Sequence, residues 1–267
     1  PNIYSLELLE SFQKTVSQYG LQEFPIHLKI DTGMNRLGIK SEEEIKKVIT
    51  LLSIYTSMRI KTVFTHLAAS DEPAFDRFTQ DQFVKFEKLY QLFSDAFNYK
   101  IDRHVLNSAG IERFPEKQFE MVRLGIGLYG VSNTGLPLEN IGTLKSTISQ
   151  VKVVKPGETV GYSRKGEISS ESKIAIVPLG YADGLDRKLG NKNGCAFIHN
   201  KKVPIIGNIC MDMLMLDVSG LKVKPGDKVE LFGPNISILE VAKNASTIPY
   251  EVLTGISQRV KRIYLQE

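Results

Sequence analysis

The stretch HLKIDTGMNRLGIK, residues 27–40, decides the fold of the first half of this 267-residue chain. It is apolar up to Ile30, which predicts a buried strand, and then becomes polar. Arg36 lies in the polar part, between Gly33 and Gly38, and glycines allow the chain to turn sharply. A strand that ends in such a charged turn is typical of α/β proteins, which place their chemistry at strand ends.

The alternation of strand and helix continues along the first half of the chain. Ser41 and Glu44 have the spacing of a capping box, which predicts the start of a helix. Apolar residues from Phe86 to Phe97 recur at intervals of three and four, the pattern of a helical stripe. The four predicted strands are IHLKI (26–30), IKTVFTHLA (60–68), HVLNSAG (104–110) and MVRLGIGLYG (121–130). Strands that alternate with helices predict crossover units and a parallel sheet.

From about Ser146 the pattern changes to short β-branched runs separated by turns. In VKPGETV (154–160) and VKPGDKV (223–229), proline and glycine fit the central positions of type II turns. ISILEVAKNA (236–245) predicts one short helix, and the other predicted strands are KIAIVPLG, CAFIH, KVPIIG and MLMLDV. This half is therefore predicted to be mostly β, and SNTGLPLENIG (132–142) is the predicted linker.

The domain prediction is an α/β domain over residues 1–137 and a mostly β domain over residues 138–267. An eight-stranded TIM-type (β/α)8 barrel takes about 250 residues, so the first domain is expected to be about the second half of such a barrel. The chain begins at Pro1, without a methionine, in helix-like sequence. We therefore expect it to be part of a longer protein.

Composition excludes several classes of protein. The chain is 42% hydrophobic and 24% charged, as soluble globular proteins are, and no apolar run approaches the ~18 residues of a membrane span. The net charge of +4 is spread along the chain, which argues against a nucleic-acid partner. Cys195 and Cys210 are too few for a disulfide framework and predict a cytoplasmic protein. Paired Cys/His spacing is lacking, so no metal site is expected.

Polar side chains follow all four predicted strands. Because the carboxyl ends of parallel strands meet at one rim, we expect these groups to converge there. They are Asp31 and Arg36, Thr65 and His66, Asn107 and Ser108, and finally Arg123, Gly125 and Gly127. Arginines, a hydroxyl and a glycine turn are suited to an anionic, phosphate-bearing ligand. The structural alternatives are ion pairs for the arginines, a core position for the histidine, a helix cap for the serine and a plain turn for the glycines.

Three motifs of the second half offer further candidates. GETVGYSRKGE places Tyr162 after a turn, and VPLGYADG contains Tyr181. NICMDM contains Met211 and Asp212. Tyrosines and methionines in β domains are commonly packing residues, so these candidates also have a structural alternative.

Seven ordered motifs resemble those of the alanine racemases. They are KIDTGMNRLG, FTHLAASDE, NSAGIERFP, MVRLGIGLYG, ETVGYS, PLGYADG and NICMDM, and the resemblance covers nearly the whole chain. It implies a bacterial enzyme of the pyridoxal-phosphate fold type III group, with an eight-stranded α/β barrel and a C-terminal β domain. It also implies a head-to-tail homodimer, whose active sites lie between one barrel and the partner's β domain.

The resemblance implies which residues bind the cofactor. Ser108, with the backbone amides of Gly125 and Ile126, matches the positions that bind the phosphate, and Arg123 matches the arginine that hydrogen-bonds the pyridine nitrogen. An arginine cannot place its proton on that nitrogen, so the ring is a weaker electron sink, and proton return is favoured over side reactions.

The resemblance also implies catalytic residues. Tyr162, contributed by the partner subunit, matches the base on one face of the substrate Cα. A tyrosine side chain with its usual pKa of about 10 is a poor base near neutrality. His66 and Arg123 are expected to form a polar chain that lowers the cost of its ionisation.

Further roles concern the substrate. Arg36 resembles the arginine that approaches the substrate carboxylate and the ring oxygen of the cofactor. Lys29 matches the position of a carbamylated lysine that orients this arginine, with an ordinary ion pair as the alternative. The backbone N–H of Met211, also from the partner, is expected to bind the carboxylate. Tyr181 matches a position that lines the entrance, and Asp212 a polar position nearby.

Two departures from the family pattern matter. Gln258 stands where some members have a tyrosine that touches the phosphate and narrows the entrance. The family's cofactor lysine belongs to a motif that ends in a tyrosine–glycine–histidine run, which this sequence lacks. Because racemisation needs proton removal on one face and delivery on the other, we expect the chain alone to be catalytically incomplete.

The sequence therefore predicts part of an enzyme that interconverts L- and D-alanine for peptidoglycan, and fusion behind a cell-wall ligase is one explanation of its internal start. One alternative is a racemase for serine or lysine, since the motifs define the cofactor better than the side-chain pocket. Another is a non-catalytic relative that binds phosphate ligands or self-associates.

Overall fold

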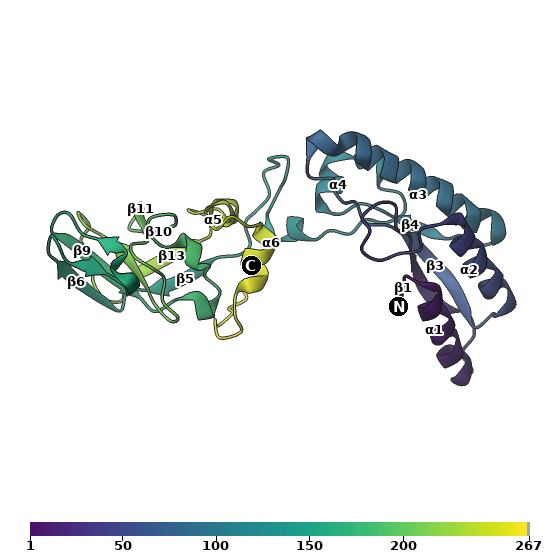
Figure 1. Cartoon of the computed structure of the whole chain (residues 1–267), viewed down its shortest axis with the longest axis horizontal. Coiled ribbons are helices and arrows are strands. Elements are labelled where there is room, and N and C mark those ends of the chain that lie inside the picture. The colour runs from purple at the N-terminus through teal and green to yellow at the C-terminus, as the bar shows by residue number, and fades with distance from the viewer. Residues whose placement is uncertain (266–267) are drawn as a thin grey trace. The chain divides into compact units, whose positions relative to one another are not determined.

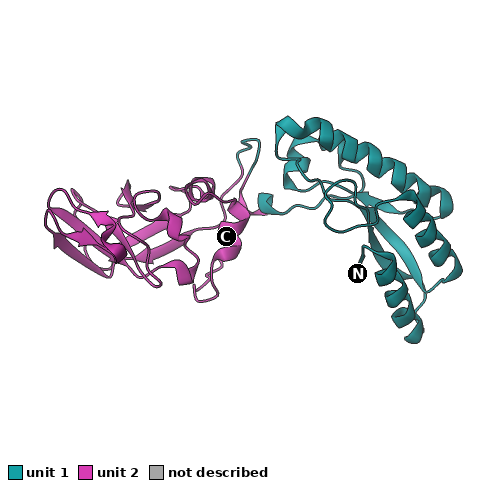
Figure 2. Cartoon of the chain, in the orientation of Figure 1, with its two compact units in different colours: residues 1–127, 132–137 teal, residues 128–131, 138–267 magenta. Residues whose placement is uncertain are grey.

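The computed structural model describes residues 1–265 and divides the chain into two compact units (Figure 2). Unit 1 comprises Pro1–Gly127 and Ser132–Pro137. Unit 2 comprises Leu128–Val131 and the chain from Leu138 onward. No helix in the described part of the chain is both long and apolar enough to cross a membrane.

Unit 1 is built around a sheet of four parallel strands, whose spatial order β1-β2-β3-β4 is also their order in the chain. The strands are β1 (Asn2–Ile3), β2 (Phe24–Lys29), β3 (Met58–Phe64) and β4 (Asp102–His104). The helices that follow them are α1 (Leu6–Gln18), α2 (Glu42–Ile54), α3 (Asp76–Ala96) and α4 (Ser108–Arg113). Sequential strands, each followed by a helix, are the arrangement of (β/α) barrels.

The two faces of this sheet differ in polarity, because successive side chains of a strand point to opposite faces. Helices α1, α2 and α3 form a layer on one side of the strands (Figure 1). Leu28 and Val63 belong to the hydrophobic core that these helices cover. On the strands β2, β3 and β4 the alternate positions carry His27, Thr62 and His104. The sheet therefore has an apolar face toward the helices and a face with polar side chains.

The predicted helices of unit 1 are confirmed. Ser41 and Glu44 form both hydrogen bonds of a capping box at the start of α2. The apolar stripe lies on α3, which ends at Ala96, and Phe97 follows as its cap. The cap of α4 is Asn107, whose side chain accepts a hydrogen bond from the backbone of the third residue after it.

The last predicted strand, residues 121–130, is not a strand. Its first three residues make two backbone hydrogen bonds, of 3.2 Å to Arg103 of β4 and of 3.0 Å to Leu106 just beyond it. Its end forms the short 3-10 helix η3 (Ile126–Tyr129). Gly125 and Gly127 turn their N–H groups to the hydroxyl of Ser108, so these groups cannot continue a strand ladder.

Two further boundaries in unit 1 differ from the prediction. The first residues are not helical throughout: Asn2–Ile3 pair with β2, and α1 begins at Leu6 after the cap residue Ser5. The third predicted strand ends at His104, and Ser108 is already the first residue of α4. The fourth strand of the sheet is thus β1, at the other edge.

Unit 2 is built from antiparallel sheets, as expected for a mostly β half. One sheet has the order β11-β10-β13-β5, a second β12-β9-β6, and β7 pairs with β8. The strands are β5 (Leu144–Thr147), β6 (Gln150–Val154), β7 (Thr159–Val160), β8 (Gly166–Glu167), β9 (Ser172–Val177), β10 (Cys195–Ile198), β11 (Lys201–Pro204), β12 (Leu214–Asp217) and β13 (Lys228–Phe232). Its helices are α5 (Ile238–Asn244) and α6 (Pro249–Gly255).

The repeated Pro-Gly turns of unit 2 are confirmed. Gly157 and Gly226 have φ angles of 85° and 91°, the conformation that glycine tolerates best. Each turn is closed by a backbone hydrogen bond between its first and fourth residues, of 3.1 and 3.2 Å. Both turns therefore owe their shape to the same two residue types.

Candidate active site

In unit 1 the turn after β2 holds the first group of predicted site residues. The Asp31 carboxylate accepts hydrogen bonds from the backbone N–H groups of Gly33 and Asn35, at 2.9 and 3.1 Å. Two backbone hydrogen bonds of 2.9 Å close the turn: they join Ile39, at its end, to Lys29 and Asp31, at its start. The buried aspartate thus orders its own loop, and the loop presents Arg36 at the surface.

Three cations gather at this rim. Burial lowers the pKa of Lys29, and the nearby charges of Arg36 and Arg123 lower it further, while Asp31 opposes them. Within residues 1–265, neither these arginines nor Lys29 forms a salt bridge with a carboxylate. A positive cluster with so little internal compensation favours an anion.

His66 lies in the field of the same cations, two residues beyond β3. Burial, and then the charges of Arg123, Arg36 and Lys29, lower the pKa of His66 to about 4. The imidazole is therefore neutral at pH 7 and can accept a hydrogen bond or a proton. Gln82 of α3 donates to the His66 carbonyl at 3.3 Å, which fixes the backbone at this point.

The buried guanidinium of Arg123 is held by the ends of β3 and β4. Its Nη1 contacts Nδ1 of His104 at 2.6 Å and the carbonyl of the same residue at 2.9 Å. Its Nη2 donates to the carbonyls of Thr65 and Val105, at 2.7 and 3.1 Å. These contacts use all four terminal N–H groups, and Nε–H has no acceptor among residues 1–265. Burial lowers the pKa of Arg123 to about 10, so the side chain stays charged at neutrality.

Ser108 forms a cradle with the glycine turn after Arg123. Its buried hydroxyl accepts from the backbone N–H of Gly125 at 2.9 Å and of Gly127 at 3.2 Å. A Cβ atom built on Gly127 lies 2.8 Å from a terminal methyl carbon of the exposed Leu124, so that side chain would have to move to admit one. The buried Ile126 lies between the two donors. Convergent N–H groups beside a hydroxyl can hold an anion.

The predicted residues of unit 2 gather around the loop after Asn208. The side-chain amide of Asn208 donates to the carbonyl of Tyr162 at 3.1 Å, and Tyr162 is 67% exposed at the start of η4 (Tyr162–Arg164). The backbone N–H of Tyr181 donates to the Cys210 carbonyl at 3.0 Å. The side chain of Met211 is exposed. These residues form a second group, within unit 2.

An ion-pair network adjoins this second group. Arg259 donates to Asp212 at 2.7 Å and lies 3.4 Å from Asp183 of η5 (Tyr181–Asp183). Gln258 immediately precedes Arg259 in the sequence, and its side chain is exposed. Through Arg259, the segment that contains Gln258 therefore contacts the loop that carries Met211.

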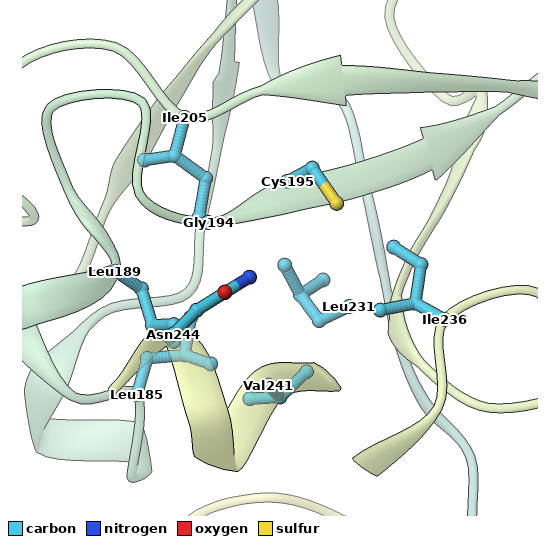
Figure 3. A pocket seen from close by; sticks show the side chains of 9 residues that line it. All are labelled: Leu185, Leu189, Gly194, Cys195, Ile205, Leu231, Ile236, Val241 and Asn244. Atoms are coloured by element: carbon cyan, nitrogen blue, oxygen red, sulfur yellow. The ribbon is translucent and has the colours of Figure 1, made fainter. Parts of the chain in front are cut away.

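A small pocket in unit 2 contains none of the predicted site residues. It has a volume of about 10 Å³, and its side chains are almost all apolar (Figure 3). Its lining residues are Leu185, Leu189, Gly194, Cys195, Ile205, Leu231, Ile236, Val241 and Asn244. Such a cavity holds no more than one water molecule. In the described part of the chain, no three His, Cys, Asp or Glu residues gather as metal ligands.

Sequence reasoning missed three polar residues on the polar face of the sheet. His27, Thr62 and His104 lie next to Arg123 or lead to it through hydrogen bonds. A signal was present for His27, which stands between two apolar residues, but not for Thr62 and His104, which follow charged residues. The register that brings them together follows from strand pairing, in which His27 lies opposite Thr62.

The fold and these groups define a class of protein: a barrel-like α/β domain with an anion site at its strand ends, followed by a β domain. Two family models match the chain. "Alanine racemase, N-terminal domain" matches residues 1–133, and "Alanine racemase, C-terminal domain" matches residues 141–264. The chain belongs to the alanine racemase family.

Individual relatives agree with this assignment. The alanine racemase of Methanococcus maripaludis is 38% identical over 98% of this chain, which spans 72% of that protein. The solved alanine racemase of Clostridium difficile 630 is 34% identical with a TM-score of 0.90, over 99% of this chain and 70% of that one. The alanine racemase of Bartonella henselae, solved with covalently bound pyridoxal phosphate, is 32% identical with a TM-score of 0.87, over 99% and 73%.

Proposed function

We propose that the protein interconverts L- and D-alanine and that the groups around Arg123 hold its cofactor. Membership of the alanine racemase family makes it a pyridoxal-phosphate-dependent isomerase. Support for the site comes from the cations Lys29, Arg36 and Arg123, which gather at one rim with Asp31 as the opposing charge. A ligand with a phosphate and a carboxylate supplies the missing negative charge.

The residues present fit pyridoxal phosphate. Ser108 and the N–H groups of Gly125 and Ile126 would hold the phosphate, and the Nε–H of Arg123 would donate to the ring nitrogen. Arg123 retains its proton because even its lowered pKa of about 10 is far above that of a pyridine. When bound, the cofactor supplies an electron-withdrawing ring that acidifies the Cα–H bond of an amino acid.

The other site residues bind the substrate and move its proton. Tyr162 takes a proton from Cα, or returns it, on one face. His66, neutral at pH 7 because its pKa is about 4, can share a hydrogen bond with the phenol. The backbone N–H of Met211 and the guanidinium of Arg36 bind the carboxylate. Tyr181 and Asp212 lie close to the Met211 loop, where they would border the entrance.

Completion of the site by other chain segments is a further part of the proposal. Unit 1 would be the second half of a (β/α)8 barrel over residues 1–137, beside a β domain over residues 138–267. The cofactor lysine would come from the barrel's first strand. Tyr162 and Met211 would come from the partner subunit of a homodimer, and their exposed side chains are free to do so. The D-alanine formed would serve peptidoglycan synthesis in the cytoplasm.

A kinetic experiment tests the role of Tyr162. In the complete racemase, Tyr162→Phe should lower kcat about 100-fold or more, because general acid–base groups contribute 10²- to 10⁴-fold. Deuterium from the solvent should still be incorporated at Cα of one alanine enantiomer, because the base on the face opposite Tyr162 is intact in this variant. Arg36→Lys should slow exchange into both enantiomers alike. Tyr250→Phe, an exposed tyrosine of α6, is the control and should retain wild-type rates.

Two results would contradict these assignments. Wild-type protein that turns over serine or lysine as fast as alanine would point to a racemase of broader scope. Tyr162→Phe with unchanged kcat would remove the tyrosine from the mechanism.

A further inference from the structure

A chain of hydrogen bonds crosses the polar face of the sheet and ends on Arg123. Nη1 of Arg123 lies 2.6 Å from Nδ1 of His104. Nε2 of His104 lies 2.9 Å from the hydroxyl of Thr62, and that hydroxyl lies 2.7 Å from Nδ1 of His27. The chain thus links the end of β4 through the middle of β3 to β2. We refer to His27, Thr62 and His104 as the relay.

The direction of every bond in the relay follows from its first donor. A guanidinium can only donate, so Nδ1 of His104 must accept and its proton must be on Nε2. That Nε2–H then donates to the oxygen of Thr62. The Thr62 hydroxyl has its own proton left to donate to Nδ1 of His27. Only one arrangement of protons satisfies all three contacts, with both histidines neutral.

The surroundings of the relay favour this arrangement. Thr62 and His104 are buried, and unpaired polar groups there would be costly. The His104 ring stacks on Phe64 at a centroid distance of 4.6 Å with only 9° between the planes, which fixes its orientation. Burial, then Arg123 and His27, lower the pKa of His104 to about 4, and burial also lowers the pKa of His27.

We propose that Thr62 and His27 are positioning residues for Arg123: through His104 they hold the guanidinium so that its Nε–H points to the ligand. The backbone carbonyls of Thr65, His104 and Val105 hold the guanidinium at the ends of β3 and β4. The relay adds one side-chain contact, from Nη1 of Arg123 to Nδ1 of His104, and the His104 ring is itself oriented by its hydrogen bond to Thr62. The functional part of this inference rests on the proposed role of Arg123 in the racemase.

The first experiment tests the relay by NMR of the unliganded protein. The sequence has only four histidines, so their ring nitrogens can be assigned with single variants. At pH 7 we expect His104 and His27 to be neutral with the proton on Nε2, and the Thr62 hydroxyl proton to be protected from exchange. A proton on Nδ1 of His104, or a charged His104, would overturn the relay.

The second experiment tests its function with Thr62→Val, which keeps the shape of the side chain and removes the hydroxyl. In the complete racemase we expect kcat to fall about fivefold, the effect of one buried hydrogen bond, at unchanged KM for alanine. Thr62→Ser, which restores the hydroxyl, should recover kcat to within about twofold. His27→Leu, at the partly exposed end, should lower kcat in the same direction and covers the case that Thr62→Val does not fold.

The outcomes separate the two proposals. Wild-type kcat in both Thr62→Val and His27→Leu would overturn the positioning role even if the relay protons are as expected. A wild-type protein with the expected relay but without alanine racemisation would instead overturn the proposed function.

Discussion

At the scale of single residues, Ser108 combines two properties that an anion site needs. Its hydroxyl is buried, and it collects the N–H groups of Gly125 and Gly127 at one point. When a phosphate arrives, the Ser108 hydroxyl and the N–H of Gly125 can turn to its oxygens, beside the N–H of Ile126 in the same turn. The site is therefore organised before the ligand binds.

Ser108→Ala should weaken the binding of pyridoxal phosphate about 10- to 100-fold, because a hydrogen bond to a charged group contributes about 1.5–3 kcal/mol. Isothermal titration of the complete racemase measures the dissociation constant. Ser41→Ala is the matched control: it removes the cap of α2, costs about 1 kcal/mol of stability, and should leave the affinity unchanged. Equal affinities for wild type and Ser108→Ala would exclude Ser108 from the phosphate site.

Lys29 has the surroundings that carbamylation requires. Its amine is buried, its pKa is lowered, and Arg36 and Arg123 are close enough to favour a negative charge in its place. An uncharged amine and carbon dioxide give a carbamate and release one proton. With ¹³C-labelled bicarbonate, the protein should therefore show one carbamate carbon signal by NMR.

That signal should disappear in Lys29→Met and persist in Lys40→Met. Lys40 is the control because it is exposed and donates a hydrogen bond to Asn35 of the same loop. A signal that survives in Lys29→Met would place the carbamate elsewhere. Absence of any signal in the wild type would leave Lys29 as an ordinary buried amine.

At the scale of secondary-structure elements, Arg123 depends on how its segment is attached to β4. The Glu120 carboxylate accepts three hydrogen bonds from Arg103, of 2.8, 3.0 and 2.8 Å. The Arg103 side chain lowers the pKa of Glu120 to about 2. This ion pair and the backbone hydrogen bonds of Met121 and Arg123 attach the start of residues 121–130, which were predicted as a strand, to β4 and the residues after it.

Glu120→Gln should lower the free energy of unfolding by about 1–2 kcal/mol at pH 7, because it replaces charge-assisted hydrogen bonds with weaker ones. Urea titration measures the difference. The matched control is Glu43→Gln, which breaks an exposed, solvent-screened pair with Lys47 within one helix and should leave the stability nearly unchanged. If the two variants lose the same stability, the Glu120 pair contributes no more than a surface contact.

The elements show which parts of the fold the sequence could predict. Local signals were sufficient for α2, with its capping box, and for the Pro-Gly turns, because the residues that act are adjacent in the chain. Residues 121–130 are apolar like a strand, but their glycines bond to Ser108, and no local pattern encodes that contact. The family motifs similarly predicted Ser108 and Arg123, whereas the relay depends on the register between β2 and β3.

At the scale of the whole molecule, the change of pattern near Ser146 predicted that the chain has two parts with different architecture. Parallel βα units lie in unit 1 and antiparallel sheets in unit 2. The predicted role of Tyr162 requires a second subunit. A subunit interface is formed by side chains from two copies of the chain, and local sequence patterns do not reveal such contacts. The homodimer was therefore predicted only from the resemblance to a family.

Stability against acid should reflect the two neutral histidines of the site. Burial, reinforced by Arg123, lowers the pKa values of His66 and His104 to about 4, whereas unfolded histidines titrate near 6.5. Between these values the unfolded chain binds more protons than the folded one, so stability rises with pH across this window. From pH 7 to pH 5 the free energy of unfolding should fall by about 2 kcal/mol, a figure discounted for partial exposure.

Urea titration at the two pH values, in a buffer without phosphate, measures this fall. Phosphate must be left out because an anion among Lys29, Arg36 and Arg123 would favour protonated His66 and hide the effect. His66→Gln should reduce the fall by about half, since one of the two histidines no longer takes up a proton on unfolding. A wild-type stability that is equal at pH 5 and pH 7 would mean that burial and the nearby cations do not keep these imidazoles neutral, and the case for an anion at this rim would lose its electrostatic basis.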